Sequence, residues 1–284
     1  MLPAIVTVLC FSYLPMFGNI IAFMDYSPLN GWMGLNSPWV GFKWFVQIFT
    51  DKYFTDLIFR SVYYNVFNVV LYFPFPIILA LLINEIRNSL FKRVVQTISY
   101  VPYFVSWVTV SLLVYLFVSS DGILYQIFAY FGYKSVIMGN PDNFPIILLL
   151  TNIFKNIGFG SILYLAAITT IDSQLYEAAR IDGAGKFAQF RFITFRGILP
   201  TMVIMLILNI GSLFAANFEQ VYVLQNPLIV RDTSTIAVYS FITGIQSQQY
   251  SIGAAISLFQ GALSALLIVA SNQISKKVSG YGLF

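Results

Sequence analysis

Six long apolar stretches constrain this chain more than any other feature of its sequence. A helix rises about 1.5 Å per residue, so about 20 mostly apolar residues cross roughly 30 Å of hydrocarbon with every backbone group hydrogen-bonded. The stretches predict membrane spans near residues 2–23, 57–83, 94–118, 144–168, 197–218 and 252–272. We therefore expect an all-α membrane protein in which residues 1–284 form a single transmembrane domain.

Composition supports this prediction and excludes several kinds of site. Of 284 residues, 58% are hydrophobic and 9% are charged, which is far from the usual composition of a water-soluble chain. The absence of His and the presence of one Cys exclude a histidine-based triad, a histidine-ligated metal, an internal disulfide and a multi-thiolate metal site. We predict that the chain is not an enzyme and has no metal site.

The distribution of Lys and Arg predicts the orientation of the spans, because cytoplasmic connections carry an excess of these residues. The predicted cytoplasmic segments 84–93, 169–196 and 273–284 hold Arg87, Lys92, Arg93, Arg180, Lys186, Arg191, Arg196, Lys276 and Lys277. The longer segments on the other side hold Lys43, Lys52, Lys134 and Arg231. Both termini are therefore predicted to be cytoplasmic. The net charge of +4 is attributed to this topology rather than to nucleic-acid binding.

Two charges fall inside or beside predicted spans. Arg60 is near a span end, from which its side chain can reach the interface. Lys155 is near mid-span, where an ionisable group is costly and typically faces the bundle interior or water. No acid is expected at the same depth. Lys155 could pair with backbone carbonyls, pair with a partner subunit, or attract an acidic sugar such as a uronate; we favour the structural role.

The longest predicted cytoplasmic connection, residues 169–196, has the pattern of two short helices. Asp172 or Ser173 can cap the first helix, and Glu177 lies near its positive start. Gly183 suits the left-handed conformation that ends a helix. The sequence therefore predicts a helix-turn-helix on the cytoplasmic face, at which a partner docks.

The second short helix is expected over residues 186–193, before Pro200 opens the fifth span. The run of residues 177–184, EAARIDGA, followed by Phe190, Ile193 and Pro200, resembles the EAA loop of permeases of binding-protein-dependent ABC importers. The resemblance implies ATPase coupling for Glu177, Ala178, Ala179, Asp182, Gly183 and Ala184. One departure is that Phe195-Arg196 stands where the family has Leu-Pro.

The resemblance extends over most of the chain and favours the maltose-type branch, whose permeases carry oligosaccharides and polysaccharides. The supporting segments are 39–42, 155–159, 217–222, 250–251 and 281–284. It implies a bacterial cell membrane protein that works with a second, homologous permease as a heterodimer, two ATPase subunits and an external solute-binding protein. ATP and Mg would bind to the partner ATPase. This chain lacks the phosphate-binding loop, since Phe187 follows Lys186 where Ser or Thr is required.

Polar residues in and beside spans four and five are candidates for a sugar pathway. A sugar offers hydroxyl edges and flat C–H faces, so hydrogen-bonding side chains and aromatic rings suit it. The candidates are Asn152, Lys155, Asn156, Asn209, Ser212, Asn217 and Tyr222. Polar side chains in membrane helices also bond to neighbouring helices, so this structural role stays open for each of them.

Small residues recur every four positions in the sixth span, at Gly253, Ser257, Gly261 and Ala265. Such a stripe permits close approach of another helix, in this chain or in the second permease.

Three other functions are weighed against sugar import. An importer for a non-sugar solute would share the loop, whereas a membrane scaffold or passive channel would have no use for it. An integral membrane enzyme is disfavoured because the clustered carboxylates Asp172, Glu177 and Asp182 belong to the docking loop.

Overall fold

The computed structural model describes residues 2–30, 34, 36–119, 122–132, 137–214 and 217–284, so Lys134 lies outside the described residues. The described chain is helical, with an isolated antiparallel bridge between Met24 and Trp39. Six helical stretches are long and apolar enough to cross a membrane. They are Leu2–Phe23, Lys52–Glu85, Trp107–Ile127, Pro141–Thr169, Lys186–Gly211 and Tyr250–Ser279. The predicted all-α membrane protein is confirmed, with six candidate membrane spans among the described residues.

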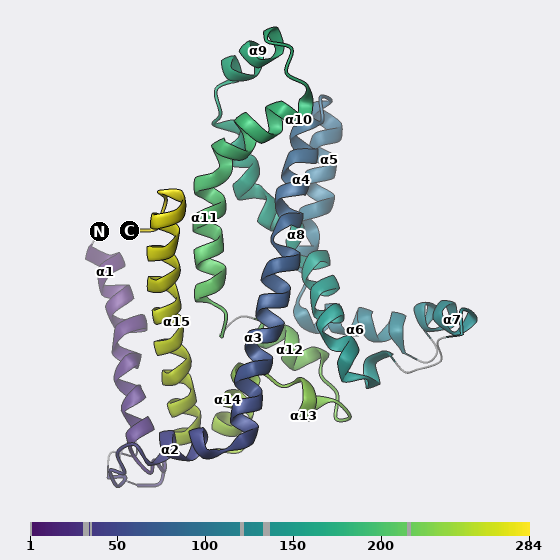
Figure 1. Ribbon diagram of the computed structural model, residues 1–284. Coiled ribbons are helices and arrows are strands. Elements are labelled where there is room, and N and C mark those ends of the chain that lie inside the picture. Colours follow the sequence, from purple (N-terminus) through teal and green to yellow (C-terminus); the bar gives the residue numbers. More distant parts are fainter. Residues whose placement is uncertain (1, 31–33, 35, 120–121, 133–136, 215–216) are drawn as a thin grey trace.

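A central helix, α8, organises the bundle. It contacts α3, α4, α5 and α11, while α15 packs against α11 and the first span (Figure 1). We call the end of the bundle that carries α9 the loop end (Figure 1). The bounds of the long elements are α3 Lys52–Tyr72, α4 Pro74–Glu85, α5 Ser89–Tyr100, α6 Trp107–Val118, α8 Phe144–Thr169, α11 Phe195–Gly211 and α15 Tyr250–Ser279.

Shorter helical elements complete the chain. The first span is made of consecutive α, π and 3₁₀ segments, and α2 crosses the end of the bundle opposite to α9 (Figure 1). The bounds are α1 Leu2–Val8, η1 Leu9–Tyr13, η2 Leu14–Phe23, α2 Lys43–Thr50, η4 Val101–Phe104, α7 Ile123–Tyr130, η5 Ile137–Gly139, η6 Pro141–Asn143, α9 Ser173–Ile181, α10 Lys186–Gln189, η7 Phe190–Thr194, α12 Phe218–Leu224, α13 Val230–Thr233, α14 Ile236–Phe241 and η8 Ile242–Gln246.

The prediction of a continuous third span over residues 94–118 is wrong. Helix α5 ends at Tyr100, a 3₁₀ turn follows, and Val105 and Ser106 are extended before α6 begins at Trp107. Pro102 in the 3₁₀ turn lacks a backbone N–H donor, and the side chain of Ser106 caps α6 by accepting a hydrogen bond from the Thr109 N–H. Helix α6 then runs sideways from the bundle (Figure 1).

Two further span boundaries differ from the prediction. The second span reaches from Lys52 to Glu85 and changes from α3 to α4 at Phe73, because Pro74 interrupts the helical hydrogen bonds. The fifth span ends at Gly211 rather than near residue 218, and Pro200 lies inside α11 rather than at its start.

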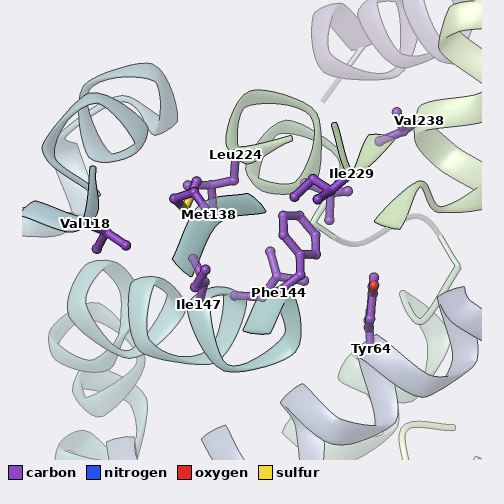
Figure 2. Close-up of a cluster of buried hydrophobic side chains, with 10 residues drawn as sticks. Tyr64, Val118, Met138, Phe144, Ile147, Leu224, Ile229 and Val238 are labelled. Atoms are coloured by element: carbon purple, nitrogen blue, oxygen red, sulfur yellow. The ribbon is translucent and has the colours of Figure 1, made fainter. Parts of the chain in front are cut away.

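Part of residues 219–251, the segment predicted to be an external connection, packs into the protein interior. Leu224, Ile229 and Val238 in this segment are almost fully buried. They pack with Phe144 of α8 and with Tyr64 of α3 in one hydrophobic cluster (Figure 2). The apolar run over Ile236–Gln246 is shorter than a membrane span. A hydropathy search for helices of span length therefore does not detect it.

Candidate coupling loop and transport cavities

The 169–196 loop forms the predicted helix-turn-helix. The side chain of Asp172 caps α9 by accepting a hydrogen bond of 2.9 Å from the Gln174 N–H. At the other end of α9, Gly183 has φ +76°. The Ala184 N–H donates to Ala179 O and the Gly183 N–H donates to Arg180 O, which is the Schellman arrangement of a helix C-terminus. Asp172, rather than Ser173, is therefore the cap.

The residues expected to couple to an ATPase differ in exposure. Glu177, Ala178, Asp182 and Gly183 are exposed, whereas Ala179 and Ala184 are half-buried. Two large apolar side chains that the sequence analysis did not single out are also exposed near the tip: Ile181 is 87% exposed and Phe187 is 73% exposed. An acidic side chain and bare apolar side chains on one loop make a surface suited to a protein partner.

Two side-chain contacts connect the loop to the spans. The hydroxyls of Tyr176 and Thr194 share a hydrogen bond of 2.9 Å, which joins α9 to the turn that leads into α11. Lys186 Nζ lies 2.8 Å from a carboxylate oxygen of Glu85, at the end of α4. A displacement of the loop would therefore be transmitted through these two contacts to the second and fifth spans.

Five of the predicted pathway residues line one cavity of about 290 Å³ among α3, α8 and α11, which we call the asparagine cavity. They are Asn152, Asn156, Asn209, Ser212 and Asn217. Asn65 and Asn68 of α3 also line it and were missed, although their spacing of three places them on one helix face. Aromatic lining is provided by Tyr72, Phe73, Tyr103, Phe159 and Tyr164.

Hydrogen bonds join the amides across this cavity. Asn156 Nδ2 donates to Asn152 Oδ1 over 2.5 Å, and Asn152 Nδ2 donates to Asn68 Oδ1 over 2.7 Å. Asn217 Nδ2 donates to Asn65 Oδ1 over 3.0 Å. The bonds of Asn68 and Asn65 tie α3 to α8 and to the residue before α12. These amides therefore hold neighbouring segments together, and they also line the cavity.

The other two predicted residues, Lys155 and Tyr222, line a second cavity of about 730 Å³, which we call the lysine cavity. Trp107, Phe218 and Glu219 line it as well. The presence of Glu219 corrects the expectation that no acid lies at the depth of Lys155. A short helix, α12, brings this carboxylate back beside the spans, which a count of charges between spans does not foresee.

Lys155 is bonded to backbone carbonyls at the break in the third span. Its Nζ donates a hydrogen bond of 2.6 Å to Tyr103 O and also donates to Val105 O. The same Nζ lies 5.4 Å from the ring centroid of Tyr103 and 5.5 Å from that of Trp107, within cation–π range. The favoured structural role has a geometric basis in these contacts. An ammonium group has three N–H donors, and two of them are used in these hydrogen bonds to described residues.

Comparison with known proteins identifies the chain. Residues 72–279 match the family described as the binding-protein-dependent transport system inner membrane component. The chain belongs to that family. The resemblance found in the 169–196 loop is thereby confirmed at the level of the family, and the chain is a multi-pass inner membrane permease subunit rather than an enzyme.

Similar members of this family cover almost the whole chain. The polygalacturonan/rhamnogalacturonan transport system permease protein YteP of Bacillus subtilis (strain 168) is 38% identical, over 100% of this chain and 88% of its own length. A crystal structure of a bacterial alginate ABC transporter in complex with an alginate pentasaccharide-bound periplasmic protein contains a chain that is 32% identical. It superposes with a TM-score of 0.88, over 99% of this chain and 94% of that one.

The small-residue stripe of this permease subunit divides into two halves. Gly253 packs against Gly244, because a Cβ on Gly253 would lie 2.5 Å from the Gly244 Cα, and Ser240 Oγ lies 3.1 Å from Ser257 Oγ. This half meets a helix of the same chain. Gly261 and Ala265 are exposed, and no described atom outside the local helix lies within 4 Å of a Cβ built on Gly261.

Proposed function

We propose that this permease subunit imports an acidic oligosaccharide or polysaccharide fragment, with ATP hydrolysed by two partner subunits that dock on the 169–196 loop. A second, homologous permease would complete the path as a heterodimer, and an external solute-binding protein would deliver the sugar. In this arrangement the loop end faces the cytoplasm together with both termini. ATP and Mg bind to the partner ATPase.

The lysine cavity is the observation that carries the proposal. Its aromatic residues offer flat faces to a pyranose ring, while Asn156 and the remaining donor of Lys155 can bind hydroxyl or carboxylate oxygens. Acidity of the substrate is supported by the relatives. A solved transporter described as involved in the import of the acidic polysaccharide alginate contains a chain 32% identical to this one, with a TM-score of 0.88.

The exposed surface of the loop supports the ATPase partner. In this proposal the exposed Glu177 would pair with a basic residue of the ATPase, and the half-buried Ala179 would allow close helix approach. Gly183, with φ +76°, supports the tight turn between them and α10. Closure of the ATPases would move α9, and through Tyr176 and Lys186 it would shift the spans that line the cavities. The ATPases can shift the equilibrium between the inward-open and outward-open states only through contacts that differ between those two states.

Partner recovery tests the assembly. The tagged chain is solubilised gently from its native membrane, and bound proteins are identified by mass spectrometry for the unmodified chain, Glu177→Lys and Asp142→Lys. Asp142 is exposed near the start of α8, outside the loop, so its variant makes the same charge change away from the proposed ATPase surface. We expect an ATPase and a second permease with the unmodified chain and Asp142→Lys, and loss of the ATPase with Glu177→Lys. A chain that comes out alone would favour a scaffold or channel.

Substrate class is tested on the recovered complex. We expect tetragalacturonate or an alginate tetrasaccharide, presented by the co-purified binding protein, to stimulate ATP hydrolysis in proteoliposomes. Cellotetraose serves as the neutral control of equal length. Stimulation by cellotetraose but not by the uronates would contradict an acidic substrate, and stimulation by neither would favour an importer of another solute.

A further inference from the structure

We infer that Tyr103 is a gating residue, whose ring divides the asparagine cavity from the lysine cavity and must move before a solute can pass between them. This inference rests on the proposed function, because it assigns the two cavities to one path. Tyr103 and Asn156 are the described residues that line both cavities. The two cavities therefore meet at these two residues, one aromatic and one amide.

The ring of Tyr103 is held by an aromatic neighbour on α8. It stacks on Phe159 with ring centroids 3.8 Å apart and an angle of 9° between the planes. We call this pair the aromatic partition. Phe159 also lines the asparagine cavity, so the stack covers that side of the boundary. An offset or stacked aromatic pair is a weak contact compared with the stability of a fold, which suits an element that opens.

The two sides of the boundary differ in their attachment. Asn156 is fixed on α8 by its hydrogen bond to Asn152, which is bonded in turn to Asn68. Tyr103 instead lies in the 3₁₀ turn of the broken third span, two residues before the extended pair Val105 and Ser106. Backbone in that conformation lacks the continuous hydrogen bonds of an α-helix, so we assign the movement to Tyr103.

Lys155 positions the gate rather than forming it. Its hydrogen bonds to Tyr103 O and Val105 O hold the turn on both sides of Phe104. Lys155, Gly158 and Phe159 lie on one face of α8, three and four residues apart. A Cβ on Gly158 would overlap the backbone of Ser99, so α5 lies directly against this face just before the break. A shift of α5 relative to α8 would therefore be transmitted to Tyr103.

Thiol labelling tests the gate without any sugar. In a Cys10→Ser background, Met205→Cys reports on the asparagine cavity and Val223→Cys on the lysine cavity, since each residue lines only the named cavity among those described. A membrane-impermeant maleimide is applied to the assembled, nucleotide-free complex from the side opposite the loop end. We expect Val223→Cys to react in every background, and Met205→Cys to react about tenfold faster when Tyr103→Ala removes the stacked ring.

Two further variants separate gating from misfolding. Tyr103→Phe keeps the stack and should leave Met205→Cys protected, while Lys155→Met releases the turn and should raise its labelling with Tyr103 still present. Co-purification of the ATPase with each variant shows that the complex has assembled. If Met205→Cys is labelled at the same rate with Tyr103 present and in the Tyr103→Ala variant, in an assembled complex, the gating role of Tyr103 is wrong. That result would leave the proposed function intact, because the proposed function depends on partner recovery and uronate-stimulated ATP hydrolysis.

Discussion

Lys186 and Glu85 form an ion pair, with 2.8 Å between Lys186 Nζ and a carboxylate oxygen, that joins the start of α10 to the end of α4 across 101 residues of sequence. Both side chains are largely exposed, so the pair contributes only about 0.2–1 kcal/mol to stability. Its position between the loop and the second span gives it a larger expected effect on coupling than on folding.

Glu85→Gln is therefore expected to leave the thermal midpoint of the detergent-solubilised chain nearly unchanged while lowering the ratio of substrate-stimulated to basal ATP hydrolysis. Lys186→Met should give the same loss, and the double variant should lose no more than either single change, because one interaction is removed in each case. Additive losses would show that the two residues act separately.

Gly183→Ala is expected to destabilise the loop by about 1–2 kcal/mol, because an alanine at φ +76° has an unfavourable left-handed backbone. Recovery of the ATPase with the tagged chain should fall. Gly185→Ala is the matched control, since Gly185 has φ −69° and no described atom beyond its chain neighbours lies within 4 Å of its built Cβ. The control should bind the ATPase normally; equal loss in both variants would contradict the assigned turn.

Gly158→Ala is expected to reduce the free energy of unfolding by about 1–3 kcal/mol, because its Cβ meets the Ser99 backbone and α5 must move away from α8. Gly261→Ala provides the comparison within a membrane helix. Its Cβ meets no described atom within 4 Å, and alanine favours helix over glycine by about 1 kcal/mol. Thermal unfolding in detergent should separate the two variants clearly.

Gly261→Leu tests the exposed half of the small-residue stripe. The variant should fold normally as an isolated chain, because the side chain enters open space. If the second permease packs there, its recovery should fall, while Leu at Gly253, which faces Gly244, should instead destabilise the chain itself. Normal recovery with Gly261→Leu would place lipid rather than a subunit against this face.

Lys155→Met distinguishes substrate contact from support of the backbone. Loss of the ammonium group leaves the carbonyls of Tyr103 and Val105 without this donor, at an expected cost of about 1–3 kcal/mol. Lys155→Arg keeps a donor and should recover part of the stability. Uptake of a uronate oligosaccharide with normal affinity by Lys155→Met would exclude a carboxylate contact by Lys155.

The parts of the structure that the sequence predicted are those set by local chemistry. Asp172 caps a helix through a residue two positions away, and Gly183 ends it through backbone conformation, so both could be recognised from neighbouring residues. Likewise, Asn152, Asn156 and Asn209 could be recognised as polar groups in apolar spans. What each amide bonds to, such as Asn68, depends on packing between distant helices and could not be predicted.

The break in the third span had a local signal that hydropathy concealed. Pro102 and the capping residue Ser106 both lie within the apolar stretch, and together they favour an interruption. The bundle accommodates the break because Lys155 donates a hydrogen bond to Tyr103 O, which lies 52 positions earlier in the sequence. Burial of Gln220 has the same non-local origin, since its amide donates to Leu148 O of α8.

The bond from Lys155 to the broken span also affects how the chain is made. The break leaves the carbonyls of Tyr103 and Val105 outside any α-helix, and their donor is encoded later in the chain, on α8. During synthesis, the third span therefore reaches the insertion machinery before the residue that completes it. We therefore expect the third and fourth spans to leave that machinery together as a paired unit, with the ammonium group of Lys155 already bonded to the carbonyls that it supports.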